Sequence, residues 1–201
     1  EIVFDYVSPL GNISDVQLGV PVAINIENGI AAMALAQLSG VSNEDIKTGM
    51  ASFRGVDRRF DFKIKTDKMV YLSDYAHHPE EIKQSILSMR ALYEGKRLTG
   101  IFQPHLYTRT RDFYQEFAES LSLLDEVILT DIYPARELPI EGVSSQLIYD
   151  NLRPDIDKTL CKKEEVIDIL KKKEIEVLMT LGAGDIENYA PQICEILNER
   201  C

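Results

Sequence analysis

Short apolar runs that each lead into an amphipathic stretch follow one another along most of this chain. The runs show little polar alternation, which is typical of strands buried on both faces of a sheet. They occupy residues 69–72, 98–102, 127–129 and 177–181, and a shorter one is expected near 159–160. Repeated strand-then-helix units predict an α/β domain whose mostly parallel, Rossmann-like sheet is flanked by helices.

The stretches between these runs have helical spacing. In the first of them Ile82, Ile86 and Met89 recur at intervals of three or four residues. Pro79 suits the first helical position, and Gly95 supplies the stop. Further helices are expected around Phe113, Phe117, Leu121 and Leu124, over 144–152 and 164–173, and around Tyr189, Ile193 and Leu197.

The opening block of the chain has a different order of elements. Alternating apolar residues on both sides of the turn at 9–12 predict a hairpin. Two helices are expected to follow, one closed by Gly40 and one starting at Ser42 and Asn43. A hairpin with two helices does not resemble a complete domain.

A polar, glycine-bearing stretch at 54–59 marks the expected domain boundary. We therefore predict two parts, residues 1–54 and residues 55–201. In the second part, alternation over 60–65 predicts a strand that pairs with 69–72 and leads into the central sheet.

Composition narrows the classes of function. The net charge of −11 argues against a general nucleic-acid binder, because recognition of a phosphate backbone needs a basic face. No apolar run reaches the roughly eighteen residues that cross a bilayer, so no membrane partner is expected. Cys161, Cys194 and Cys201 follow no zinc pattern, and a cytoplasmic location is expected. The chain opens on Glu1 without a methionine, as a domain or a processed product would.

All three histidines fall in two polar segments, 74–79 and 103–110, which each follow an apolar run and precede a predicted helix. We expect these loops to project from neighbouring strand tips into one crevice. His77, His78 and His105 would then lie where helix N-termini favour an anion. Arginines in or beside the predicted loops suggest a basic pocket in this acidic chain. They are Arg54, Arg58, Arg59, Arg109, Arg111 and Arg136.

Each of these features has an alternative explanation. The histidines could hold a metal ion with Asp74 or Asp131, but adjacent histidines point in different directions from a loop, and no metal ligand is assigned. Asp74 could cap the next helix instead of binding a ribose hydroxyl. Arg109 and Arg111 could form a solvated helix face.

Two weaker signals lie outside the histidine segments. The run Gly182-Ala183-Gly184 precedes the last predicted helix but lacks the third glycine of a dinucleotide fingerprint and follows the last strand rather than the first. An anion seat or a plain tight turn fits it better. Asn25 and Asn28 share a helix face, and an asparagine amide can pair with an adenine edge, although capping or a solvated surface explains them more simply.

Five motifs, in this order along the chain, resemble those of the Mur ligase family. They are Arg58-Arg59-Phe60; Asp74-Tyr75-Ala76-His77-His78-Pro79; Phe102-Gln103-Pro104-His105-Leu106-Tyr107-Thr108-Arg109-Thr110; Asp131-Ile132-Tyr133 with Pro139-Ile140 and Gly142-Val143-Ser144-Ser145; and Gly182-Ala183-Gly184-Asp185. The resemblance covers essentially the whole chain. The two histidine segments are similar to those of the member that adds L-alanine rather than a later amino acid.

The resemblance implies a three-domain ligase of which this chain is a C-terminal fragment. Residues 1–54 would be the tail of the central ATPase domain, and residues 55–201 the C-terminal, amino-acid-binding domain. The N-terminal UDP-sugar domain and most of the ATPase domain would be missing. The phosphate loop G-x-x-x-x-G-K-[ST] does not occur in this sequence, so the fragment is expected to be inactive alone.

The implied activity is the joining of L-alanine to UDP-N-acetylmuramate in peptidoglycan synthesis. ATP would phosphorylate the muramyl carboxylate, and the alanine amine would attack the acyl phosphate, with the magnesium ligands mostly outside this fragment. Each step gathers negative charge on oxygen, which cations and N–H groups stabilise. A non-catalytic nucleotide-binding or regulatory domain of the same fold, and a metal-dependent hydrolase, stay open as alternatives.

By resemblance, ten residues receive roles in three groups. The nucleotide-binding group has Asn25 and Asn28 at adenine, Arg59 at the phosphates and Asp74 at the ribose. The group at the alanine carboxylate and reacting centre is His77, His105 and Arg109. The group that lines the substrate pocket is Tyr75, His78 and Tyr107.

Two positions depart from the family's pattern. Ile24 stands where the family usually has histidine, which weakens the adenine assignment. Leu106 stands where the family often has arginine, which leaves more of the carboxylate to Arg109.

Overall fold

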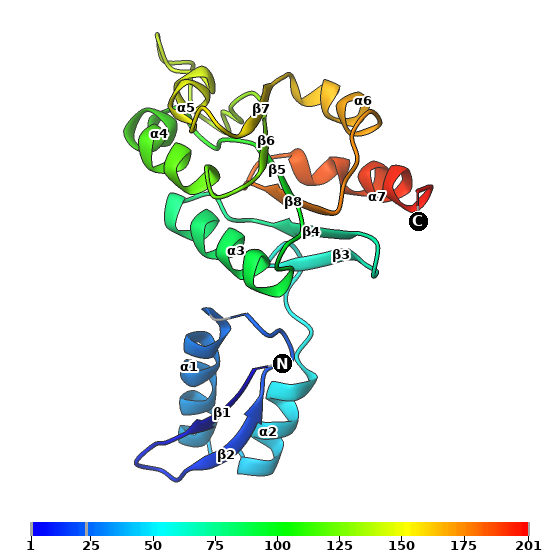
Figure 1. Ribbon diagram of the computed structural model, residues 1–201. Helices are drawn as coiled ribbons and strands as arrows, with labels where there is room; N and C mark the ends of the chain where they lie inside the picture. The colour runs from blue at the N-terminus through cyan, green and yellow to red at the C-terminus, as the bar shows by residue number, and fades with distance from the viewer. Residues whose placement is uncertain (1, 23, 201) are drawn as a thin grey trace. The chain divides into compact units, whose positions relative to one another are not determined.

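A computed structural model describes residues 2–22 and 24–200. The chain divides into two compact units between residues 56 and 57, two residues beyond the boundary expected from the sequence (Figure 1). Glu1 and Cys201, which the expectations above mention, lie outside the described residues.

The first unit contains the predicted hairpin and the two predicted helices. Strands β1 (Val3–Tyr6) and β2 (Ile13–Gln17) pair antiparallel, and helices α1 (Ile24–Leu38) and α2 (Asn43–Ser52) follow. The hydroxyl of Ser42 accepts a hydrogen bond from the backbone N–H of Asp45 and so caps α2. The small core consists of Tyr6, Ile13, Val16, Met33 and Ile46.

Large apolar side chains stay exposed on the first unit. On α1, Leu35 is 67% and Leu38 is 72% exposed. A two-stranded sheet gives little surface on which such side chains can be buried.

The second unit is built on a six-stranded sheet with the order β3-β4-β8-β5-β6-β7. Only β3 runs antiparallel to its neighbour. The strands are β3 (Asp61–Lys65), β4 (Val70–Asp74), β5 (Leu98–Phe102), β6 (Glu126–Leu129), β7 (Asp157–Leu160) and β8 (Val177–Leu181). Strands β4, β5, β6 and β8 are buried along their whole length, as their apolar sequences predict.

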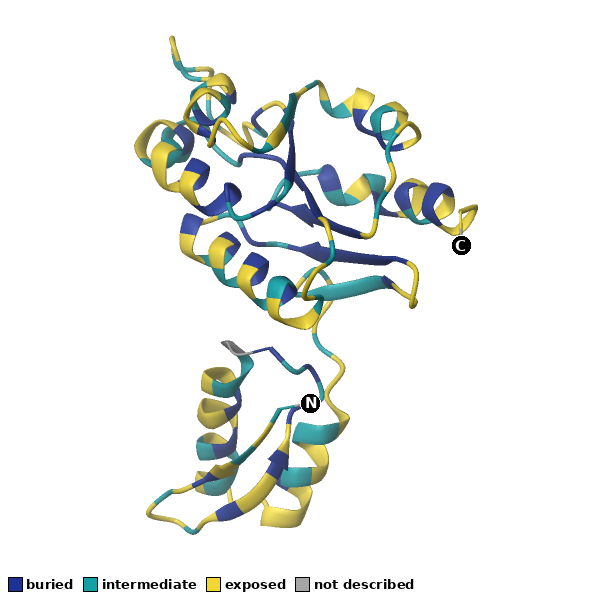
Figure 2. Ribbon diagram, viewed as in Figure 1, coloured by how far each residue is buried: buried dark blue, intermediate teal, exposed yellow. Residues whose placement is uncertain are grey.

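Helices cover both faces of this sheet, so the predicted fold class is confirmed (Figure 1). One face carries α3 (Pro79–Leu92), α4 (Tyr107–Leu121) and α5 (Gln146–Asn151), whose buried sides join a core with Leu72, Phe102 and Met179. The other face carries α6 (Val166–Leu170) and α7 (Ala190–Asn198), preceded by the 3-10 turns Lys163–Glu165 and Ile186–Tyr189. Figure 2 shows the buried strands between exposed outer helix surfaces.

The structure corrects the expectation that the two histidine segments leave neighbouring strands. Strand β8 lies between β4 and β5 and pairs with both. From β5 to β7 the sheet grows in one direction with helices on one face. The return to β8 runs in the opposite direction, so a right-handed crossover places α6 on the other face. This order depends on long-range pairing and cannot be read from local patterns.

Two predicted helices also have different limits. Helix α4 already begins at Tyr107, so Tyr107 and Arg109 lie in its first turn rather than in a loop. Leu106, the residue directly before this helix, has a positive φ of 74°. The helix expected over 164–173 is a 3-10 turn followed by the short α6.

Replacing Met179 in the centre of β8 by alanine should lower the free energy of unfolding by about 2–5 kcal/mol. The Met179 side chain is fully buried, and its loss leaves a cavity beneath α3 and α4. Urea unfolding followed by circular dichroism measures the change. Leu138→Ala is the control, because Leu138 is 83% exposed. Equal losses in the two variants would contradict the central position of β8.

Candidate functional site

The two histidine-bearing turns meet beyond the end of β8. Leu181, the last residue of β8, is in register with Asp74 at the end of β4 and with Phe102 at the end of β5. The turns that leave β4 and β5 bring the rings of His77 and His105 to a centroid distance of 6.0 Å. The carboxyl edge of a parallel sheet is where α/β proteins bind ligands.

Glu81 in the first turn of α3 holds the turn that carries His77. Its Oε2 accepts hydrogen bonds from the backbone N–H of His77 (3.0 Å) and of His78 (3.2 Å). Partial burial opposes ionisation of Glu81, but the hydrogen bonds from these two N–H groups, together with the positive charge of Arg59, lower the pKa of the carboxyl. The imidazole Nδ1 of His77 lies 2.9 Å from the carbonyl oxygen of Tyr75.

Asp74 is buried beneath this turn, and its carboxylate forms hydrogen bonds within the protein. Its side chain accepts hydrogen bonds from the backbone N–H of Ala76 (3.3 Å) and from the hydroxyl of Ser85 on α3. Burial raises the pKa of the Asp74 carboxyl, against the effect of these hydrogen bonds. In this conformation Asp74 links the end of β4 to α3, and its contact with a ribose stays a prediction.

The second turn places His105 and Arg109 side by side. The backbone of Leu106, with its positive φ, donates to the carbonyl oxygen of Tyr133 at 2.9 Å, and the N–H of Tyr133 donates to Pro104 at 2.8 Å. The guanidinium Nη1 of Arg109 then lies 3.4 Å from Nδ1 of His105. The ring of Tyr133 stacks on that of His105 at 5.6 Å.

Glu137 caps the helix that carries Arg109. Leu106 occupies the N-cap position and has no side-chain acceptor. The Glu137 carboxylate, far along the chain, accepts from the N–H of Thr108 at 3.0 Å and from its hydroxyl. The Thr108 hydroxyl, followed by backbone N–H groups, lowers the pKa of Glu137.

The electrostatics of the crevice keep one histidine uncharged. Burial, followed by the positive charge of Arg109 and by His77, lowers the pKa of His105, while Glu137 acts weakly in the opposite direction. His105 is therefore neutral near pH 7, and Arg109 supplies the fixed positive charge beside it.

Two arginines extend this charge along the ring of Tyr75. The guanidinium carbons of Arg58 and Arg59 lie 4.7 Å and 5.4 Å from the ring centroid. Arg58 also donates to the carbonyl oxygen of Gly184 at 3.3 Å and lies 3.8 Å from Glu187, whereas Arg59 is exposed. Arg59 is thus the freer of the two for an anionic ligand.

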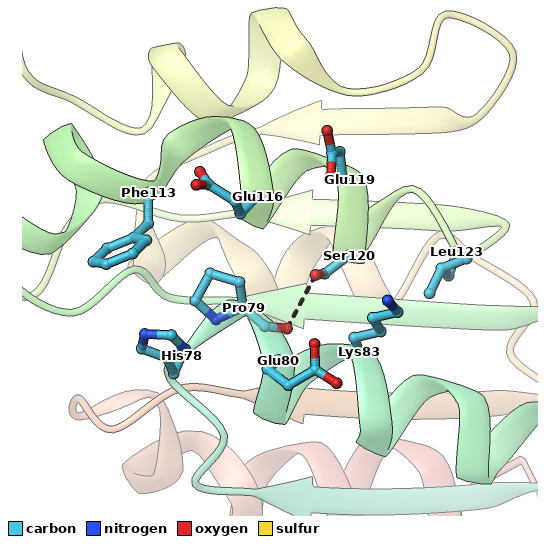
Figure 3. A pocket seen from close by; sticks show the side chains of 9 residues that line it. All are labelled: His78, Pro79, Glu80, Lys83, Phe113, Glu116, Glu119, Ser120 and Leu123. Carbon is cyan, nitrogen blue, oxygen red and sulfur yellow. Dashed lines mark hydrogen bonds between the residues drawn. The ribbon is translucent and has the colours of Figure 1, made fainter.

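His78 points away from its neighbour His77. It is exposed, and its ring lies 5.1 Å from that of Phe113, where the helical geometry of α4 is interrupted. Figure 3 shows His78 among the side chains that line a groove between α3 and α4. The groove has a volume of about 460 Å³. The groove is lined by His78, Pro79, Glu80, Lys83, Phe113, Glu116, Glu119, Ser120 and Leu123.

The remaining predicted residues fall in several places. Tyr107 is half-buried in the first turn of α4. Arg111 is exposed and pairs with Asp112 at 2.7 Å, so of the two arginines only Arg109 faces His105. In the first unit Nδ2 of Asn28 lies 3.5 Å from Oδ1 of Asn25. Nδ2 of Asn25 donates to the backbone carbonyl oxygen of Val20 at 3.2 Å.

The glycine run after β8 is a tight turn, and the side chain of Gln103 packs closely against it. A Cβ at Gly182 would lie 2.7 Å from the carbonyl oxygen of Gln103, and one at Gly184 would lie 2.2 Å from its Oε1. The buried Gln103 amide donates to Asp185 (2.8 Å) and accepts from the N–H of Ile186 (2.9 Å). The glycines are required by this close approach.

The ranges that the structure describes are residues 2–22 and 24–200. Within them no group of three or more histidine, cysteine or acidic side chains is placed to hold a metal ion. No helix in the same ranges is long and apolar enough to cross a membrane.

Sequence reasoning missed the roles of Glu81, Glu137 and Tyr133. Glu81 could have been found, because an acidic residue at the third helical position is a capping signal. Glu137 and Tyr133 act across turns, on residues 29 and 28 positions away, and no local pattern identifies them.

Fold and site together define an α/β domain with a cluster of imidazole and guanidinium groups at the carboxyl edge of its sheet. A family model described as "Mur ligase, glutamate ligase domain" matches residues 58–186. The chain therefore belongs to the Mur ligase family.

Two relatives of the chain that are similar over nearly its whole length share one name. A UDP-N-acetylmuramate–L-alanine ligase of Phocaeicola vulgatus is 77% identical over 200 residues, which is 100% of this chain and 44% of that protein. One of Parabacteroides distasonis is 60% identical over 196 residues, 98% of this chain and 42% of that protein. The chain thus spans less than half the length of the curated relatives it matches.

Solved structures share the fold. A UDP-N-acetylmuramate–alanine ligase from Thermotoga maritima has a TM-score of 0.77 at 26% identity, covering 95% of this chain and 41% of that one. A folylpolyglutamate synthase from the same organism has a TM-score of 0.66 at 16% identity, covering 94% and 43%, and shows likeness of fold alone.

Arg109→Met should raise the pKa of His105 towards 6.5, because a nearby positive charge is removed while the burial stays. A proton NMR titration of the three histidines measures this, with Arg111→Met as the control that leaves the value unchanged. Because His105 holds its proton to a higher pH in the unfolded chain, the contribution of His105 to the free energy of unfolding rises with pH below 6.5, and less so in Arg109→Met. An unchanged or lower pKa in Arg109→Met would contradict the contact.

Proposed function

We propose that this chain is the C-terminal part of an ATP-dependent ligase that joins L-alanine to UDP-N-acetylmuramate during peptidoglycan synthesis in the cytoplasm. The 77% identity to a relative of that name supports the substrate pair. In this ligase ATP activates the muramyl carboxylate as an acyl phosphate, and the amine of alanine displaces the phosphate. Magnesium accompanies ATP, with most of its ligands in the part of the protein beyond this chain.

The observation that carries the proposal is the meeting of His77, His105 and Arg109 at the carboxyl edge of the sheet. Arg109 is half-buried and has its neighbour His105 neutral, so its charge is available to a carboxylate. A guanidinium forms charge-assisted hydrogen bonds with a carboxylate. We assign the alanine carboxylate to Arg109 and His105, with Tyr75 and Tyr107 lining the pocket.

The nucleotide is assigned to a separate group of residues. Arg59, exposed beside Tyr75, is assigned to the nucleotide phosphates, and Asn25 and Asn28 on the first unit are assigned to adenine. Asp74 reaches the ribose if its internal hydrogen bonds open. The assignment of His78 to the substrate pocket has the least support, because His78 lines the groove between α3 and α4.

The first unit is assigned to the end of the central ATPase domain. Its exposed leucines on α1 support this, because they offer an apolar face to further parts of a domain. The sequence has no phosphate loop, so the chain alone lacks the groups that activate ATP.

An ADP-release assay with UDP-N-acetylmuramate, ATP and L-alanine tests the proposal. The complete protein should turn over, and this chain alone should give no signal above blank. Turnover by the chain alone would contradict its assignment as a fragment. ATP binding without alanine ligation by the complete protein would favour the non-catalytic alternative.

Arg109→Ala in the complete enzyme should raise the KM for alanine about 30-fold, because a lost charge-assisted hydrogen bond costs about 2 kcal/mol. The KM for ATP should change far less. Steady-state kinetics measures both, with Arg111→Ala as the matched control on the exposed side of α4. Equal effects on the two substrates would contradict the assignment of Arg109.

A further inference from the structure

Resting on the function proposed above, we infer that His77 and His105 hold opposite tautomers, so that the pair recognises an amino acid as a zwitterion. His77 presents an unprotonated Nε2 that takes a proton from the ammonium group. His105 presents a protonated Nε2 that donates to the carboxylate beside Arg109. Glu81 is the positioning residue of His77.

The contacts of His77 place its proton on Nδ1. This atom lies 2.9 Å from the carbonyl oxygen of Tyr75 and 3.3 Å from Oε2 of Glu81. Both partners are acceptors, so Nδ1 is the donor and Nε2 of the neutral ring is the free acceptor. The ring is only half-exposed and faces Tyr75 and His105 at its edges.

The contacts of His105 place its proton on the other nitrogen. Its Nδ1 lies 3.4 Å from Nη1 of Arg109, and a guanidinium can only donate. Nδ1 is therefore the acceptor, and Nε2 carries the proton. A positively charged His105 ring beside Arg109 is disfavoured, because burial and the charge of Arg109 lower the pKa of His105.

The two rings thus offer one acceptor and one donor, with ring centroids 6.0 Å apart and the positive charge of Arg109 beside His105. An ammonium group needs the acceptor, and a carboxylate needs the donor and the charge. A pair with identical tautomers would leave one end of the zwitterion unmatched. The opposite tautomers follow from neighbours that the fold supplies separately, namely Tyr75 and Glu81 for one ring and Arg109 for the other.

The proton transfer has a defined balance. An N–H bond of the alanine ammonium breaks, its proton forms a bond to Nε2 of His77, and the electron pair left on nitrogen attacks the acyl-phosphate carbon. Collapse of the tetrahedral intermediate expels phosphate with the electrons of the C–O bond, and the departing phosphate takes the second proton from the nitrogen, which leaves a neutral amide. The imidazolium formed at His77 is stabilised by the Glu81 carboxylate at 3.3 Å and by the Tyr75 carbonyl.

The tautomers can be measured without any ligase activity. Long-range proton–nitrogen NMR correlations of this chain, above the pH at which the histidines protonate, should show Nδ1–H for His77 and Nε2–H for His105. His78, exposed beside Phe113, is the internal reference. The same tautomer in both rings, or the reverse assignment, would overturn the inference even if the complete protein is an alanine ligase.

Kinetics of the complete enzyme separate the two roles. His105→Gln keeps an N–H donor in place of Nε2 and should lower kcat less than tenfold. His77→Gln cannot take a proton and should lower kcat by about 10²–10⁴-fold, with a residual rate that rises with pH as alanine deprotonates in solution. Equal losses in kcat, or a His77→Gln rate that does not respond to pH, would overturn the assigned roles. Absence of ligation by the wild type would instead overturn the proposed function and leave the NMR result standing.

Discussion

The pairing of β8 with both β4 and β5 is the constraint on which the rest of the second unit depends. Leu181 ends β8 in register with the last residues of its two neighbours, so three strands stop at one level of the sheet. The turns that follow β4 and β5 then converge over the end of β8, although their strands are not adjacent. The buried Gln103 fixes this junction, because its backbone donates to Leu181 and its side chain fills the glycine turn that β8 leads into.

Within this frame, carboxylates position the cationic crevice without neutralising it. Glu81 and Glu137 each accept hydrogen bonds from backbone N–H groups at a helix start, where the helix dipole favours a negative charge. The two carboxylates interact mainly with these N–H groups, so they do not neutralise the positive charge of Arg109. A chain with a net charge of −11 can therefore keep the positive charge of Arg109 at this edge of the sheet, because local geometry rather than overall charge decides the local field.

Much of this fold could be predicted from local patterns. The limits of β5 and β8 agree with the apolar runs at 98–102 and 177–181, and Pro79 begins α3 as expected. The insertion of β8 between β4 and β5 was not predictable, because it rests on contacts between residues far apart in sequence. The same distinction holds for the site. The histidines and Arg109 stand out by composition and resemblance, whereas Glu137 and Tyr133 reach the site only through the fold.

The central claim is that the crevice formed by His77, His105 and Arg109 is the seat of the alanine carboxylate. A crystal structure of the complete enzyme with a non-hydrolysable ATP analogue, UDP-N-acetylmuramate and L-alanine tests this most directly. The account predicts that the alanine carboxylate lies at hydrogen-bond distance, about 3 Å, from the Arg109 guanidinium and from Nε2 of His105. A carboxylate bound instead at Arg58 and Arg59, or in the groove between α3 and α4, would contradict it.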